Sequence, residues 1–260
     1  MAMTVPEIRE MLRGADEQGL AALERSLAAD TRKGVKAAIE AARKRLEGEK
    51  AECARVAALY SFEKSLLDSG QSVIVGLDEV GRGAVAGPLA VGAVVLPPEP
   101  MVMGLNDSKK LTPEQREAIA QEVKTHALAW AVEYVAPEDI DRDGMTASLK
   151  RAFKGALDQV DRILPCDLVL VDGNPIHIDP REKNVIKGDA KCASIAAASI
   201  VAKVTRDALM RDMAADYPEY DFGGNKGYGS AQHIDAIKAH GLSPVHRKSF
   251  CRSFMQESLF

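Results

Sequence analysis

The stretch VIVGLDEVGRG, residues 73–83, decides how this chain can fold and what it can bind. The apolar segment 73–77 leads into two adjacent carboxylates, Asp78 and Glu79, and then into Gly81-Arg82-Gly83. Two carboxylates at the end of a buried strand need a counter-ion, because like charges repel strongly at low dielectric. A divalent cation is the usual counter-ion, and a glycine loop with exposed N–H groups beside it favours phosphate chemistry.

The same glycines also fit a dinucleotide-binding pattern, G-x-G-x-x-G/A, from Gly81 to Ala86. That pattern requires a helix that begins at the glycines and holds pyrophosphate on its N-terminus. Gly87-Pro88 would break such a helix, because proline lacks an N–H and clashes with the preceding turn. The segment 89–96, LAVGAVVL, is short and β-branched and predicts a second strand instead. The sequence therefore disfavours a dinucleotide-binding fold.

The composition is that of an ordinary globular protein, with 46% hydrophobic and 28% charged residues among 260. This length can form one or two domains. No apolar run reaches the ~18 residues of a membrane span, and the N-terminus lacks a signal-peptide core. We therefore expect a cytoplasmic protein without a membrane partner. The four cysteines have no C-x-x-C spacing, which disfavours a zinc site or a disulfide framework.

The net charge of −4 argues against attraction of the whole surface to nucleic acid, but a local basic face remains compatible with it. Residues 223–260 contain five Lys or Arg against two acids, which gives that segment a charge of +3. From charge alone, a binding face and an ordinary solvated surface are both open.

Three regions are expected along the chain: a helical N-terminal extension over residues 1–70, a mixed α/β core over 71–222, and a helical C-terminal segment over 223–260. Apolar residues recur at helical spacing in the first region. Strands are expected over 73–78, 89–96, 128–135 and 167–171, with a possible short strand at 184–187. Helices are expected after Thr112 and over 145–160, 190–215 and 231–240. Because crossovers do not link all the strands, the pattern indicates a mixed α/β layer fold.

Four acids stand in similar settings. Asp78 and Glu79 end one apolar strand, Asp172 ends another (DLVLVD), and Asp189 precedes a long helix. If the strands lie side by side, these side chains converge and offer oxygen ligands to Mg²⁺ or Mn²⁺. Two such cations are the standard arrangement for attack at a phosphodiester. Simpler interpretations stay open for two of them: Asp189 as a helix N-cap, and Asp172 as part of a turn.

Six ordered blocks of the sequence resemble the bacterial ribonuclease HII family. They are GLDEVGRGAVAGPLAVGAVVL (76–96), NDSKKLTPEQR (106–116), LVLVDGN (168–174), IKGDAKCASIAAASIVAKVTRDALM (186–210), NKGYGSAQHIDAI (225–237) and SPVHRKSF (243–250). The resemblance covers about two thirds of the chain. It implies a ribonuclease H-like mixed sheet flanked by helices, with a helical N-terminal extension and a helical, substrate-binding C-terminal part.

The resemblance also implies an activity. Members of this family are endonucleases that hydrolyse the RNA strand of RNA–DNA hybrids and cut 5′ of a single ribonucleotide embedded in duplex DNA. Asp78, Glu79, Asp172 and Asp189 match the family's four catalytic, metal-binding carboxylates, which implies Mn²⁺ or Mg²⁺ as cofactor. The implied partner is an RNA–DNA hybrid or a ribonucleotide-containing duplex; protein partners are unknown.

The remaining site residues also come from the resemblance. Gly81-Arg82-Gly83 matches the motif whose backbone contacts the ribose 2′-OH, Tyr228 matches a tyrosine that packs against the next sugar, and Lys109 matches a phosphate-holding region. Physical chemistry agrees with the first assignment, because the 2′-OH alone distinguishes RNA from DNA at one position. Close backbone approach to it favours glycines on both sides of Arg82. Ser199 and Lys203 receive no role, and His246 is as readily structural as functional.

Two alternatives remain. A ribonuclease HIII-type enzyme shares the fold and the acidic pair, but it lacks the Gly-Arg-Gly sequence and carries a β-rich N-terminal domain. A non-catalytic hybrid-binding protein would bind without cleaving, against which the intact set of four acids argues. The N-terminal helices could grip duplex, add stability or contact a protein.

Overall fold

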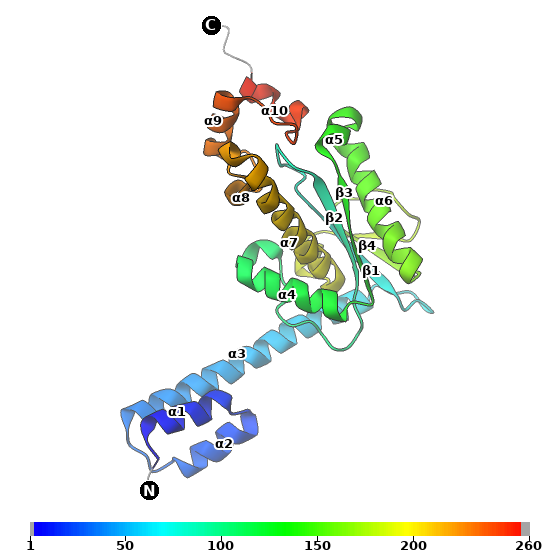
Figure 1. The fold of residues 1–260 in the computed structure, drawn as a ribbon. Helices are drawn as coiled ribbons and strands as arrows, with labels where there is room; N and C mark the ends of the chain where they lie inside the picture. The colour runs from blue at the N-terminus through cyan, green and yellow to red at the C-terminus, as the bar shows by residue number, and fades with distance from the viewer. Residues whose placement is uncertain (1–2, 256–260) are drawn as a thin grey trace. The chain divides into compact units, whose positions relative to one another are not determined.

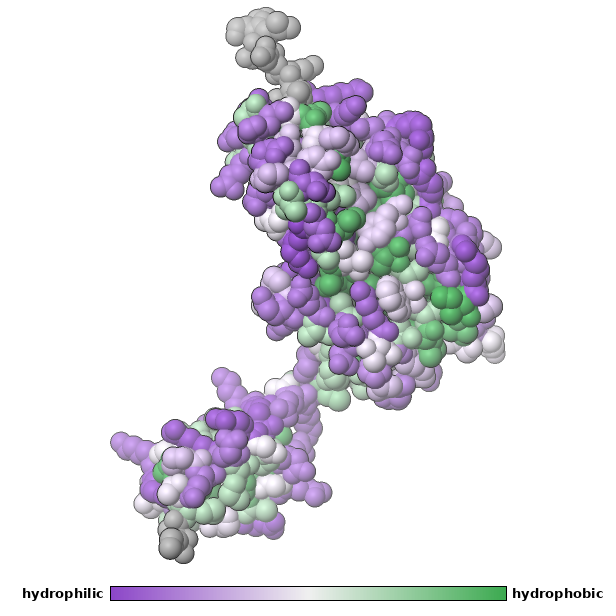
Figure 2. All heavy atoms as spheres, viewed as in Figure 1, coloured by the Kyte–Doolittle hydropathy of each residue, from purple (hydrophilic) through white to green (hydrophobic). Residues whose placement is uncertain are grey.

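The computed structural model describes residues 3–255, with side chains to residue 253. The chain divides into two compact units, residues 1–57 and 58–260, and the boundary falls within a helix (Figure 1). The viewed faces of both units are mostly hydrophilic, with smaller hydrophobic areas between (Figure 2). Among the described residues, no helix is long and apolar enough to cross a membrane.

The first unit is helical, as the sequence predicts. It contains α1 (Val5–Gly14), α2 (Glu17–Ser26) and most of α3 (Lys33–Lys64). Thr4 and Glu7 form a capping box at the start of α1, and the carboxylate of Asp16 accepts from Gly19 N–H at the start of α2. Apolar residues of the three helices form one small core: Ile8, Leu12, Leu20, Leu27, Val35 and Ala42.

The second unit is built on a five-stranded mixed sheet in the order β3-β2-β1-β4-β5. Its strands are β1 (Ile74–Val80), β2 (Leu89–Val95), β3 (Ala129–Val135), β4 (Leu168–Asp172) and β5 (Glu182–Val185). The pairs β1–β2 and β2–β3 are antiparallel, and β1–β4 and β4–β5 are parallel. The predicted mixed α/β fold is confirmed.

Helices cover both faces of this sheet (Figure 1). One face packs against α6 (Met145–Ile163), and the other packs against α7 (Ala193–Asp216), which also contacts α4 (Pro113–His126). The remaining helices are the short η1 (Ser108–Lys110), α5 (Pro137–Asp143), η2 (Gly188–Ala190), η3 (Pro218–Tyr220), α8 (Phe222–Asn225), α9 (Ala231–His240) and α10 (Lys248–Met255).

The close approach of α7 to the sheet explains two strand glycines. A Cβ on Gly92 would lie 2.4 Å from the carbonyl oxygen of Ala198, and one on Gly76 would lie 2.3 Å from the backbone nitrogen of Ile195. Because side chains alternate along a strand, Gly76 and Asp78 share the α7 side, whereas Leu77 packs on the α6 side. The glycine therefore lets α7 pass close to the strand end that carries Asp78.

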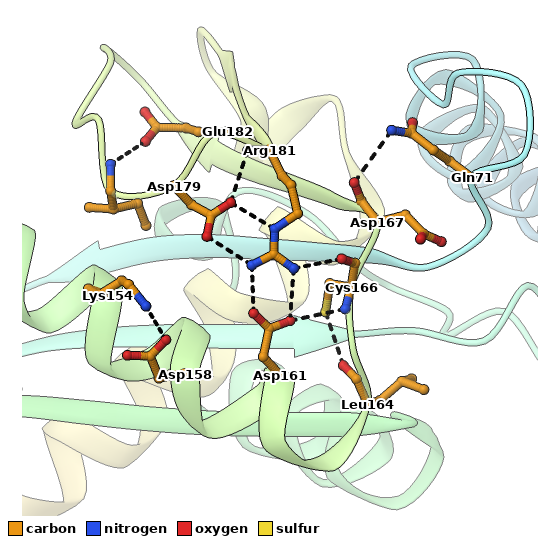
Figure 3. A network of polar contacts seen from close by, with 11 residues as sticks. Gln71, Lys154, Asp158, Asp161, Leu164, Cys166, Asp167, Asp179, Arg181 and Glu182 are labelled. Atoms are coloured by element: carbon orange, nitrogen blue, oxygen red, sulfur yellow. Dashed lines mark hydrogen bonds and ion pairs between the residues drawn. The ribbon is translucent and has the colours of Figure 1, made fainter.

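The end of the sheet away from Asp78 is held by a hub around Arg181, shown in Figure 3. The Arg181 guanidinium donates to the carboxylates of Asp179 and Asp161 and to the carbonyl of Cys166 at 2.7 Å. These contacts tie β5, the end of α6 and the start of β4 together. Arg181 is therefore a structural residue remote from the strand ends that carry the acids.

Candidate active site

The parallel register of β1 and β4 brings the first two acids together. Leu77 lies opposite Val171, so Asp78 and Asp172 follow at the same level on neighbouring strands. Asp172 also accepts a hydrogen bond from the backbone N–H of Gly188 at 2.6 Å, which places η2 and its Asp189 beside β4. Asp189 therefore precedes the long helix without capping it, since Cys192 occupies the N-cap position of α7.

Burial and like charges dominate the electrostatics of this cluster. Desolvation, together with the charges of Glu79 and Asp172, raises the pKa of Asp78 to about 8, although a hydrogen bond from Ser199 acts in the opposite direction. Burial also raises the pKa of Asp189, as do Asp107 and Asp172. Neighbouring carboxylates therefore disfavour the ionisation of Asp78 and Asp189, and a bound cation would relieve that repulsion.

The donor set fits a hard divalent cation, because the four acids supply only carboxylate oxygens. Within residues 3–253, no three His, Cys, Asp or Glu side chains already have the spacing of a formed metal site. The chemistry of the four acids therefore suits such a cation, although their side chains are not spaced as in a formed metal site.

A cavity of about 460 Å³ opens beside these acids. The predicted residues Asp78, Glu79, Asp172, Lys109 and Tyr228 line it, together with the loop 81–83. Glu79 points to the other side of β1 and also lines a neighbouring cavity of about 500 Å³, where Arg82 Nη1 lies 3.4 Å from its Oε1. The structure therefore brings these predicted residues to one place, and Asp189 lies near enough to Asp172 for the two charges to interact.

Three further residues at this site received no role from the sequence. Ser199 and Lys203 lie one helical turn apart on α7 and both line the cavity. Asp107 caps η1, where its carboxylate accepts from Lys109 N–H, and it faces Asp189. Asp107 lies inside the block 106–116, and the spacing of Ser199 and Lys203 matches one helix face, so both signals were present in the sequence.

Two buried arginines were also missed. Arg206 and Arg247 are both fully buried and donate to backbone carbonyls around the loop 81–88. Arg247 Nη1, for example, lies 3.0 Å from the carbonyl oxygen of Arg82. No local pattern reveals them, because arginine is usually exposed.

A mixed sheet with acids at the ends of two parallel strands, beside a glycine loop, fits a metal-dependent enzyme that acts on phosphodiesters. Comparison with known proteins makes this specific. The ribonuclease HII family model matches residues 75–253, and the ribonuclease HII N-terminal domain model matches residues 4–67. The chain therefore belongs to the ribonuclease HII family, the enzymes that hydrolyse the RNA strand of RNA–DNA hybrids.

Individual relatives also support membership of the ribonuclease HII family. A curated ribonuclease HII from Halalkalibacterium halodurans is 41% identical over 248 residues, covering 95% of this chain and 94% of the relative. The ribonuclease H2 of Pyrococcus horikoshii is 28% identical with a TM-score of 0.60, covering 70% of this chain and 97% of that one. The ribonuclease HII of Archaeoglobus fulgidus, solved in a complex with PCNA, is 26% identical with a TM-score of 0.61, covering 72% and 98%.

A ribonuclease HIII, Bst-RNase HIII, solved in complex with Mn²⁺, shares the fold alone. It is 22% identical with a TM-score of 0.51, covering 66% of this chain and 64% of that one. The helical N-terminal unit and the match to the ribonuclease HII N-terminal domain favour ribonuclease HII over ribonuclease HIII for this chain.

Proposed function

We propose that this chain cuts 5′ of single ribonucleotides embedded in duplex DNA, as well as within the RNA strand of hybrids, and leaves 5′-phosphate and 3′-hydroxyl ends. The observation that carries the proposal is the shared cavity. It places Asp78, Glu79 and Asp172 beside the Gly81-Arg82-Gly83 loop and Tyr228. A ribose recognised by the loop would therefore set its own 5′ phosphodiester next to the acids.

Asp78, Glu79, Asp172 and Asp189 would hold Mg²⁺ or Mn²⁺ in this proposal. Bound there, the cations would activate a water and stabilise the leaving oxygen. The raised pKa of Asp78 supports the assignment, because a carboxylate forced among like charges gains most from a cation.

The other residues would hold the substrate. The backbone of the loop 81–83 would face the 2′-OH, the one group that separates RNA from DNA at that position. The Tyr228 ring, 38% exposed at the cavity, would stack against the following sugar. Lys109 and Lys203 line the same cavity and would neutralise phosphates. Arg82 would clamp a phosphate, since a guanidinium stays protonated and cannot serve as a base.

The test is the Asp78→Asn variant, assayed with Mg²⁺ or Mn²⁺ on a duplex that contains one ribonucleotide and, separately, on a fully RNA–DNA hybrid. We expect cleavage of both substrates by the wild type and of neither by the variant, with the circular dichroism spectrum unchanged. Asp158→Asn is the matched control, because Asp158 is a partly exposed residue of α6 in the Arg181 region (Figure 3). It should retain full activity.

Each alternative gives a different result. Retained cleavage in Asp78→Asn would refute the site assignment. Cleavage of the long hybrid alone by the wild type would indicate activity of the ribonuclease HIII type. Binding of both substrates with no cleavage in either metal would indicate a non-catalytic binding protein.

A further inference from the structure

The two glycines beside Arg82 have different surroundings. A Cβ on Gly81 would lie 2.3 Å from Nε of Arg206 and 2.7 Å from its Cζ. Gly81 also has a φ of +82°, in the region that favours glycine. At Gly83, by contrast, no described atom lies within 4 Å of the Cβ position. Gly81 therefore faces the protein interior, and Gly83 faces open space.

Arg206 connects two loops through their main chains. It is fully buried on α7. Its Nε donates to the carbonyl of Pro88 at 2.8 Å, and its Nη2 donates to the carbonyl of Ala86 at 3.2 Å. Its Nη1 donates to the carbonyl of Lys226 at 2.9 Å. One guanidinium thus holds both the loop 81–88 and the loop that leads to Tyr228.

Arg206 also lies against the aromatic ring of the second loop. Its Cζ is 5.7 Å from the centroid of the Tyr228 ring, within the range of a cation–π interaction. The ring is held from the interior by this contact and stays partly exposed to the cavity. The position of Tyr228 therefore depends on the same side chain as the position of Gly81.

The main chains of the two loops touch directly. The N–H groups of Val85 and Ala86 donate to the carbonyl of Gly227 at 2.8 and 3.0 Å. A Cβ on Gly227 would lie 2.2 Å from the carbonyl oxygen of Ala86. Because the two backbones are closely packed here, neither loop can shift alone, and a change in Arg206 would move both loops.

We propose that Arg206 is a positioning residue that fixes the loop 81–83 and the Tyr228 ring relative to each other, and that only Gly83 lacks a side chain for the sake of the substrate. The absence of a side chain at Gly81 serves Arg206. This inference rests on the proposed function, which gives both the loop and Tyr228 a contact with the nucleic acid.

The test compares Arg206→Lys with Arg181→Lys. Lysine keeps the charge but loses the planar fork of donors. In Arg206→Lys we expect KM for the singly substituted duplex to rise about tenfold, equivalent to about 1.4 kcal/mol of lost binding, with kcat nearly unchanged. Hydrogen exchange at the amides of Val85 and Ala86 should become faster. Arg181→Lys loses a similar fork in the remote hub, so it should lower Tm and leave both readouts unchanged.

The outcomes separate the inference from the proposed function. If Arg206→Lys lowers Tm but changes KM and amide exchange no more than Arg181→Lys does, Arg206 is only structural and the inference is wrong. Cleavage by the wild type tests the proposed function on its own, and the exchange measurement requires no activity.

The glycines give a second test. Gly83→Ala should keep the Tm of the wild type and raise KM for the singly substituted duplex, because its Cβ enters open space on the cavity side. Gly81→Ala should lower Tm through the clash with Arg206 and the positive φ. An unchanged KM in Gly83→Ala, or an equal loss of Tm in both variants, would overturn the division of roles, and the first outcome can be measured even if Gly81→Ala does not fold.

Discussion

Two N-terminal deletions that differ by thirteen residues should differ sharply in their effect on the stability of the second unit. Removing residues 1–57 takes away the first unit, whereas removing 1–70 also takes away a segment that belongs to the second. Leu59 is 5% exposed and lies in the core beneath α4 and α7. The Tyr60 hydroxyl accepts a hydrogen bond from Val102 N–H at 3.0 Å. We therefore expect the shorter deletion to fold and the longer one to be severely destabilised.

Glu63 makes a third contribution to the stability of the second unit. Its carboxylate accepts from Ser194 N–H at 2.7 Å, at the beginning of α7, where the N-cap residue Cys192 provides no side-chain cap. Burial raises the pKa of Glu63 to about 7, against the hydrogen bonds from Ser194 and Ala193. Deleting Glu63 would leave a buried N–H of α7 without its partner.

The magnitude follows from these contacts. Losing Leu59 costs about 2 kcal/mol of apolar burial. Losing the Tyr60 hydrogen bond costs about 1 kcal/mol, and losing the cap of α7 costs about 1–2 kcal/mol. The sum, about 4–5 kcal/mol, is comparable with the whole stability of many domains, about 5–15 kcal/mol. Leu66 and Leu67, which pack on the core near Ile195, increase the loss.

The assay is urea unfolding followed by tryptophan fluorescence. The chain has one tryptophan, Trp130 in β3, so the signal reports the second unit alone. Deletion of 1–57 should leave the midpoint nearly unchanged, whereas deletion of 1–70 should lower the midpoint, with a loss of several kcal/mol in the free energy of unfolding, or prevent folding. Equal midpoints would refute the reasoning and would support the domain boundary near residue 70 that the sequence favours. The folded shorter variant also tests the N-terminal unit, because unchanged affinity for duplex would exclude a nucleic-acid role.

Three further predictions follow from single side chains. Burial lowers the pKa of His246 to about 4 from its ordinary 6.5, so the folded state loses stability as the pH falls from about 6.5 towards 4. In urea titrations at pH 7 and pH 5, the wild type should lose about 2 kcal/mol more than the His246→Gln variant does. Arg181→Met should lower stability by about 1–2 kcal/mol in the same titration, because it leaves the partly buried carboxylates of Asp161 and Asp179 without their donor, with kcat unchanged. Mn²⁺ or Mg²⁺ should raise the Tm of the wild type but not of Asp78→Asn, measured by thermal denaturation with and without the metal; an equal rise in both would remove Asp78 from the metal site.

The sequence predicts the parts of this site that depend on local pattern. An apolar run that ends in an acid predicts both the strand and the placement of the acid, as at Asp78 and Asp172, because the carboxyl ends of parallel strands meet at one edge. The helix expected over 190–215 begins instead at Ala193, because the short 3₁₀ helix η2 precedes it and the N–H of Gly188 bonds to Asp172. That turn is fixed by a long-range hydrogen bond, which no local pattern contains.

The contact between His233 and His246 also depends on long-range packing that no local pattern contains. His246 is separated from His233 by twelve residues, and the two rings meet with their Nε2 atoms 3.0 Å apart. Ser243 N–H donates to Nδ1 of His246, so Nε2 of His246 must carry the proton and donate to His233. His233 in turn donates through Nδ1 to the carbonyl of Tyr228. Both imidazoles are therefore neutral and structural, a conclusion that the sequence alone left open for His246.

The choice of arginine around the loop 81–88 has a physical reason. The N–H groups of Val85 and Ala86 bond to Gly227, and the carbonyls of the loop need donors of their own. Guanidinium meets this need, with five donors and no acceptor. Arg247 donates to the carbonyls of Arg82 and Gly87, and Arg206 donates to those of Ala86 and Pro88. Two buried positive charges thus hold these carbonyls from the interior, while Gly83 has no atom within 4 Å of its Cβ position and lines the cavity, which suits the proposed contact of the loop 81–83 with a ribose hydroxyl.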